Sequence, residues 1–160
     1  MNTSKIQIRI QTRVQIINAS SDTSPIHFTA IGKVNSPYKE KFAIPRQPGL
    51  VSAAQGKIVL QGEANNIDLV RGLEQFSHIW VVFVFHATQN QGWKPLVKPP
   101  RLGGNKKMGT LATRSTFRPN PIGMSVVKLE GIRQVTNKVG DKHIILDISS
   151  LDLLDATPVI

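Results

Sequence analysis

Apolar and polar residues alternate with a period of two in several short segments of the chain. The alternation runs through residues 27–34 and returns in residues 124–132, and the apolar residues of 57–60 and 143–148 give two further strand candidates. Successive side chains of a strand point to opposite faces, so each of these segments predicts a β-strand. Residues 79–85 are an unbroken run of β-branched, aromatic and other apolar side chains, which predicts a buried strand.

Turn-forming residues separate these strands, and only one segment predicts a helix. Residues 65–73 begin with two asparagines that can cap a short helix, and Gly72 can end it. Several strands with turn signals between them and little helix indicate a mainly β domain, closed into a barrel.

Residues 1–25 differ from the rest of the chain. Residues 4–17 alternate like a strand, and a cluster of Asn, Ser, Asp, Thr and Pro follows at 18–25. An organelle transit peptide is the alternative, but such peptides form amphipathic helices and this period is strand-like. We therefore expect residues 1–25 to be an extension and residues 26–160 to be one domain.

Positive charge is concentrated in one part of the chain. The formal net charge is +10, and residues 94–118 contain seven Lys or Arg and no acid. Such a segment attracts polyanions, and RNA is the leading partner. An anionic membrane is disfavoured because no basic amphipathic helix and no apolar run of about 20 residues is present. We expect no metal site, since the chain has no Cys and its four His lack ligand spacing.

The stretch 101–123 combines this charge with glycines and prolines. Residues 118–121, Arg-Pro-Asn-Pro, predict a stiff loop, because Pro fixes its own φ and restricts the preceding residue. A rigid loop rich in donors can cradle an anion. A solvated basic surface loop is the alternative.

Residues 45–50, Pro-Arg-Gln-Pro-Gly-Leu, predict an extended piece and a turn that hold Arg46 and Gln47 outward. An ordinary turn is the alternative. Asp152 and Asp155 could bind a cationic group or a ribose, or could lie in a solvated turn. No phosphate-loop motif and no glycine-rich dinucleotide fingerprint is present, which disfavours a Rossmann-type methyltransferase.

Six ordered motifs closely resemble the TsaA-like family, the tRNA threonylcarbamoyladenosine methyltransferases also called TrmO proteins. They are PRQPGL (45–50), GLEQFSHIW (72–80), FVFH (83–86), PPRLGGN (99–105), ATRSTFRPNPIGMS (112–125) and SLDLLDATPV (150–159). The resemblance covers about residues 28–160. It implies a small single-sheet β-barrel with one or two short helices that binds S-adenosylmethionine without a Rossmann fold. It also implies a cytoplasmic homodimer, with the cofactor near the subunit boundary.

The resemblance further implies methylation of the exocyclic amine nitrogen of threonylcarbamoyladenosine next to the anticodon of tRNA. Carried over by motif, the cofactor-binding residues are Pro45, Arg46, Gln47, His86, Ala87, Arg114, Met124, Asp152, Leu153, Leu154 and Asp155. The residues expected to meet tRNA are Lys98, Arg101, Lys106, Lys107 and Arg118. His78 and Asp155 are weak candidates for a catalytic base. The alternative is an RNA-binding or cofactor-binding barrel without catalysis.

Two departures from the family pattern stand out. Ala156 occupies a position where the family often has Gly, and this costs some backbone freedom. The chain ends at Ile160, before an Asp-Ile-Lys-Pro-Tyr run and a C-terminal part usual in bacterial members. If that part helps to hold tRNA, we expect cofactor binding with weak methylation.

Overall fold

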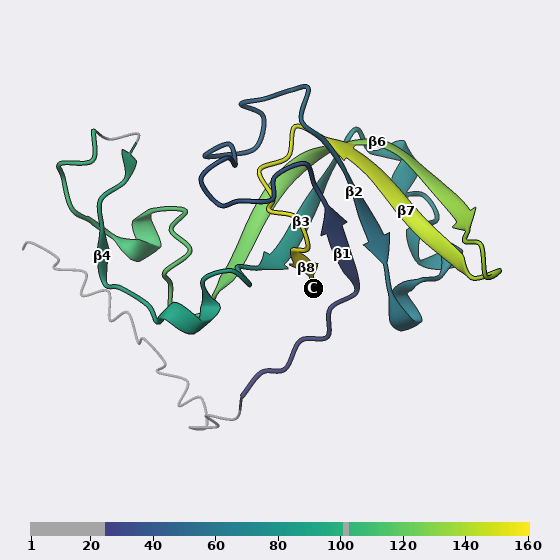
Figure 1. Cartoon of the computed structure of the whole chain (residues 1–160), viewed down its shortest axis with the longest axis horizontal. Helices are drawn as coiled ribbons and strands as arrows, with labels where there is room; N and C mark the ends of the chain where they lie inside the picture. The colour runs from purple at the N-terminus through teal and green to yellow at the C-terminus, as the bar shows by residue number, and fades with distance from the viewer. Residues whose placement is uncertain (1–24, 101–102) are drawn as a thin grey trace, which may run out of the picture.

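The computed structural model describes residues 25–100 and 103–160, and six of its strands close into an antiparallel barrel (Figure 1). The predicted strand at residues 4–17 and the predicted RNA contact Arg101 lie outside the described residues. Around the barrel the strand order is β1-β2-β7-β6-β3-β8. The bounds of these strands are β1 Gly32–Asn35, β2 Gln55–Leu60, β3 His78–Val84, β6 Ile122–Thr136, β7 Lys142–Ser149 and β8 Pro158–Val159. The prediction of a mainly β barrel is confirmed.

Strand β6 is the longest strand, and two neighbours share it. Its first half pairs with β3, from Ile122 opposite Val84 to Lys128 opposite His78. Its second half pairs with β7, and the register shifts between Leu129 and Gly131. A bulge of this kind bends and twists a strand, which allows the two halves of β6 to follow the curve of the barrel.

The core lies inside the barrel and is built from alternate residues of the strands. Val34, Val81, Val127 and Ile148 are at most 2% exposed. The period-two pattern therefore predicted the inward face of β6 correctly, whereas residues 27–31 of the strand expected at 27–34 lie before β1 and are exposed. The expectation of a buried strand at 79–85 holds for one face only, because Trp80 on the outer face is 67% exposed. An antiparallel sheet needs only one covered face.

The last ten residues complete the barrel. Leu151 and Leu153 are buried in the core, and β8 pairs with both β1 and β3 through Val159. The strand pattern in the sequence did not predict β8, because two residues are too short to show a period.

The helix expected over residues 65–73 consists of two 3-10 helices, η2 Ile67–Val70 and η3 Leu73–Gln75. The side chain of Asn66 accepts a hydrogen bond from the backbone N–H of Asp68 at 2.9 Å, and Gly72 between the helices has φ 88°. The capping asparagine was therefore predicted correctly, whereas Gly72 is the N-cap of η3 and the C-cap of η2 is Arg71. Further short 3-10 helices in the described part of the chain are η1 Gly62–Ala64, η4 Gln89–Gln91 and η6 Thr110–Ala112. Within the described ranges, no helix has the length and apolar character needed to cross a membrane.

Residues 85–100 and 103–121 leave the barrel between β3 and β6 and form an arm at its side (Figure 1). The arm carries a second, two-stranded sheet, in which β4 Leu96–Val97 pairs with β5 Met108–Gly109. The basic stretch identified in the sequence belongs largely to this arm.

Candidate functional site

A cleft of about 870 Å³ lies between the arm, the barrel and the β1–β2 loop. Five segments of the chain line it: residues 41–47, 83–88, 94–100, 112–117, and 152–154 with Thr157. Nine of the eleven predicted cofactor residues lie on its walls, namely Pro45, Arg46, Gln47, His86, Ala87, Arg114, Asp152, Leu153 and Leu154. The geometry thus brings together residues that were selected by motif alone.

Two aromatic rings at the end of β3 form an apolar part of the cleft wall. The rings of Phe83 and Phe85 meet edge to face, with centroids 5.2 Å apart. Gly123 on β6 lies against both rings, and a Cβ at this position would come within 2.5 Å of Phe83 and 2.7 Å of Phe85. Neither Gly123 nor the pair of rings was identified as a site feature from the sequence, which predicted only a buried strand at residues 79–85.

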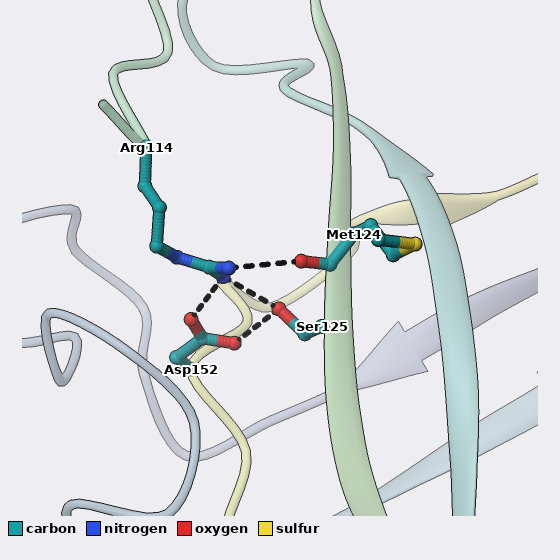
Figure 2. Close-up of polar contacts among 4 residues, drawn as sticks. All are labelled: Arg114, Met124, Ser125 and Asp152. Atoms are coloured by element: carbon teal, nitrogen blue, oxygen red, sulfur yellow. Dashed lines mark hydrogen bonds and ion pairs between the residues drawn. The ribbon is translucent and has the colours of Figure 1, made fainter. Parts of the chain in front are cut away.

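Arg114 is held by a compact polar network (Figure 2). Its Nη2 donates to Asp152 Oδ2 at 2.8 Å and to Ser125 Oγ at 2.9 Å, and its Nη1 donates to the carbonyl of Met124 at 3.1 Å. The Ser125 hydroxyl donates in turn to Asp152 Oδ1 at 2.6 Å. A guanidinium has five N–H donors, so two remain for a ligand in the cleft. Arg114 is therefore fixed in place without being fully occupied.

Asp152 and Ser125 are the buried members of this network. The side chain of Asp152 is 5% exposed, whereas that of Arg114 is 48% exposed. Ser125, on the inward face of β6, is 1% exposed. Asp152 therefore acts mainly by orienting Arg114, and Ser125 is a site residue that motif comparison missed.

The loop before β6 is braced by its own short side chains. Thr113 Oγ1 accepts from the N–H of Ser115, and Ser115 Oγ accepts from the N–H of Phe117, both at 3.2 Å. Arg118 donates from Nε to the carbonyl of Ser115 and from Nη2 to that of Thr113, at 3.0 and 2.7 Å. Such side-chain to backbone bonds stabilise turns. Arg118 thus supports the loop that carries Arg114, and its predicted tRNA contact remains a prediction.

Asp155 lies outside the cleft and anchors the β1–β2 loop. Its Oδ1 accepts from the N–H of Ser36 at 2.9 Å, and its Oδ2 pairs with Lys39 at 2.7 Å. The hydrogen bond from Lys39, followed by that from Ser36, lowers the pKa of Asp155. The carboxylate lines a second, separate depression of about 630 Å³. Asp155 therefore secures the base of the loop that presents Arg46.

Met124 and His78 also lie away from the cleft in this single chain. The side chain of Met124 is 49% exposed on the outer face of β6, opposite Val82. His78 is exposed at the start of β3, the opposite end from His86, and its Nδ1 lies 3.0 Å from Ser77 Oγ. Of these two histidines, only His86 faces the cleft.

The charge of the cleft walls is strongly positive. Among the described residues, the cationic side chains on the walls are Lys41, Arg46, Lys94, Lys98 and Arg114, and the only acid on them is Asp152. Lys106 and Lys107 are exposed on the arm beyond the cleft. No cluster of three metal-ligating side chains occurs in residues 25–100 and 103–160. The site is suited to an anionic organic ligand.

The closed barrel and its basic cleft define a small β-barrel protein with a ligand site that is unrelated to the doubly wound nucleotide-binding folds. Comparison with known families gives the particular family. The model described as the tRNA-methyltransferase O N-terminal domain matches residues 33–160, and the chain belongs to this family.

Relatives of known name are similar over most of the chain. The tRNA (adenine(37)-N6)-methyltransferase of Escherichia coli (strain K12) is 58% identical over 137 residues, which are 86% of this chain and 56% of that protein. The protein of the same name from Homo sapiens is 36% identical over 146 residues, 90% of this chain and 31% of that protein. A crystal structure of TrmO from Pseudomonas aeruginosa superposes with a TM-score of 0.64 at 40% identity, over 85% of this chain and 53% of that one. The chain thus spans about half the length of its bacterial relatives.

Proposed function

We propose that this chain transfers a methyl group from S-adenosylmethionine to the exocyclic amine nitrogen of threonylcarbamoyladenosine, next to the anticodon of tRNA. The observation that carries the proposal is the convergence of nine motif-derived residues on one basic cleft. The names of relatives at 58% and 36% identity support it. Residues 26–160 would act as one catalytic domain with residues 1–25 as an extension, in the cytoplasm where tRNA is used.

The residues of the cleft fit this cofactor. Arg46 is exposed and makes no ion pair within the described part of the chain, so its guanidinium is free to bind the carboxylate of the methionyl group. The two remaining donors of Arg114, which lines the same cleft, would bind the same anion or a ribose. Phe85 is half-buried and offers apolar surface to a purine, and the buried ring of Phe83 packs edge to face against it. The cofactor itself supplies an electrophilic methyl group on a sulfonium.

The contribution of the protein to the reaction is mainly alignment. Holding two reactants in productive orientation can supply on the order of 7–11 kcal/mol of the activation barrier. The Asp152–Arg114–Ser125 network fixes one wall, and the side chains of residues 113–118 brace it from behind. The acceptor nitrogen bears a carbonyl that makes its proton easier to lose, so a strong base is not required. His86 is the only histidine on the described cleft walls and is better placed than His78 or Asp155 to take that proton.

The arm supplies the RNA-binding surface in this proposal. Lys98 lies on the cleft wall, and Lys106 and Lys107 extend the positive surface outward. Cations arranged along a groove neutralise phosphates and guide a single-stranded loop into the site. The threonyl carboxylate of the modified base would meet the same cations.

We also propose that the chain acts as a homodimer through the outer face of β3 and β6. Cross-strand pairs there align six apolar side chains: Trp80 with Val126, Val82 with Met124, and Val84 with Ile122. An isologous contact matches such a face with its own copy. The face borders the cleft, because the carbonyl of Met124 binds Arg114. Met124 would then reach the cofactor site at the subunit boundary. Trp80→Lys should shift the sedimentation coefficient to that of a monomer, and a monomeric wild type would refute the dimer.

Calorimetry and methyl transfer test the function directly. The wild-type chain should bind S-adenosylmethionine, and Arg46→Ala and Arg114→Ala should each weaken this binding at least tenfold. Incubation with tRNA bearing threonylcarbamoyladenosine and labelled cofactor should label the RNA. Cofactor binding without label transfer would favour the alternative, a binding module without catalysis. Equal cofactor binding by wild type and Arg114→Ala would refute the site.

A further inference from the structure

Phe42 is the most exposed aromatic side chain on the cleft walls. It lies in the β1–β2 loop, four residues before Arg46, and is 78% exposed. The Nζ of Lys41 lies 5.2 Å from the centroid of its ring. An exposed phenyl ring is unfavourably hydrated. Because Phe42 lines the cleft and its ring is exposed to solvent, a planar ligand can stack on it.

The same combination of ammonium and ring occurs a second time in the cleft. The Nζ of Lys94, on the arm, lies 4.7 Å from the centroid of the Phe117 ring. Phe117 is half-buried, so the arm already covers much of this ring. Phe42 is the ring that is left open. A nucleotide matches an open ring beside an ammonium, because its base stacks on the ring and its phosphate meets the cation.

We infer that Phe42 is the stacking platform for the adenine base of the acceptor nucleotide, with Lys41 against an adjacent phosphate. The inference rests on the proposed function, which supplies a nucleotide as acceptor. A base that is to be methylated must leave its stack in the RNA loop, and an aromatic surface replaces the lost stacking.

Space and exposure favour the acceptor over the adenine of the cofactor. The cleft, at about 870 Å³, lies near the upper end of the range of about 300–1,000 Å³ for small-molecule sites, which leaves room for a second ligand beside the first. The predicted cofactor residue His86 and its neighbour Phe85 are half-buried, whereas Phe42 is open to solvent. The open ring thus lies where an RNA loop can reach it.

The experiment compares two RNAs with four proteins. One RNA is an anticodon stem-loop with threonylcarbamoyladenosine beside the anticodon, and the other is the same RNA with an abasic site there. The proteins are the full chain, Phe42→Ala, Phe42→Tyr and the control Val139→Ala. Val139 is 85% exposed in the β6–β7 turn and does not line the cleft.

Phe42→Ala should weaken binding of the intact RNA on the order of tenfold and leave binding of the abasic RNA unchanged. Phe42→Tyr should restore the affinity, and Val139→Ala should bind both RNAs like the wild type. Since the ring is exposed, thermal unfolding of Phe42→Ala should match that of the wild type. Cofactor binding should be unchanged as well.

Equal weakening for both RNAs, or none for either, would overturn the inference. Loss of S-adenosylmethionine affinity in Phe42→Ala would also overturn it, because the ring would then stack on the adenine of the cofactor and not on that of the acceptor. These readouts need no turnover, so they are separate from the test of catalysis. A wild type that binds RNA through Phe42 but transfers no methyl group would refute the proposed function and not the platform.

Discussion

Arg114 and Asp152 form an ion pair of 2.8 Å between the arm and the segment that closes the barrel. The pair joins two segments that are 38 residues apart and fixes one wall of the cleft. Because Asp152 is buried and also accepts from Ser125, its charge is held in a fully hydrogen-bonded setting. Hydrogen bonds to charged groups contribute more to stability than neutral ones.

Asp152→Asn should therefore lower the free energy of unfolding by about 1–3 kcal/mol. It should also weaken cofactor binding, because Arg114 loses the partner that orients it. Urea denaturation and calorimetry measure the two effects. Asp68→Asn is the control, since the Asp68–Arg71 pair is exposed on both sides and should change stability by at most about 1 kcal/mol. Equal losses in both variants would contradict this account of the network.

Gly123→Ala should destabilise the protein by about 1–3 kcal/mol. The added methyl group would lie within 2.7 Å of both Phe83 and Phe85, so the rings must move and the cleft wall with them. Gly131→Ala on the same strand is the matched control, because no other group lies within 4 Å of the place that its methyl group would take. The thermal unfolding temperature and the cofactor affinity should fall in the first variant only.

The fold was predictable wherever a strand was long enough to show its period. The inward face of β6 followed from alternation, β2 and β7 were found as apolar strand candidates, and the turn between β6 and β7 followed from its turn-forming residues. The two-residue strands β4, β5 and β8 were not predictable, since they exist only through pairing with distant segments. The outer face of β3 was misjudged because its apolar residues look like core in sequence.

The site was predictable from motifs only as a set of residues. Motif comparison placed Arg46, His86, Arg114 and Asp152 in one site, and they share one cleft. It did not reveal that Asp155 braces a loop, nor that Arg118 donates to backbone carbonyls. Those roles depend on which neighbours a side chain meets after folding. Ser125 and Gly123 could not be recognised as site residues from the sequence. Ser125 acts through one hydroxyl that bonds Arg114 and Asp152, and Gly123 acts by leaving room for two phenyl rings.

Ala156→Gly should raise the free energy of unfolding by up to about 1 kcal/mol. Ala156 has φ 63°, a left-handed conformation that costs an L-residue roughly 1–2 kcal/mol. Glycine relieves this cost, but it loses more chain entropy on folding, so the net gain is smaller. Gly140→Ala is the converse test, since Gly140 has φ 98° and open space around it, and it should destabilise. A loss of stability in Ala156→Gly would show that the backbone is not strained there.

Acid should weaken the attachment of the β1–β2 loop. The folded-state pKa of Asp155 is lowered from its ordinary value of 3.8, so its stabilisation is present above about pH 3.8 and is lost as the pH falls through the lowered pKa. The pKa of Glu130 is lowered too, chiefly by its hydrogen bond with Ser149. Protonation of Glu130 in acid should therefore also destabilise the fold. Asp155→Asn should therefore be less stable than wild type at pH 7, and the difference in free energy of unfolding should shrink as the pH falls below 3.8 and through the lowered pKa. A difference that stays constant over this range would contradict the assignment.

The lysines of the arm should govern the salt dependence of tRNA binding. Each phosphate contact contributes about 0.7 to 0.9 to the slope of log affinity against log salt concentration, depending on whether the RNA strand is single or paired. The double variant Lys106→Ala, Lys107→Ala should therefore lower the magnitude of that slope by about 1.4 to 1.8 and weaken binding to every tRNA alike. Cofactor affinity should be unchanged, because neither side chain lines the cleft. Lys138→Ala, exposed in the β6–β7 turn, is the matched control and should leave the slope as it is. An equal change of slope in the double variant and in Lys138→Ala would contradict the prediction. It would mean that loss of positive charge weakens binding wherever it occurs, so the RNA would not bind specifically on the arm.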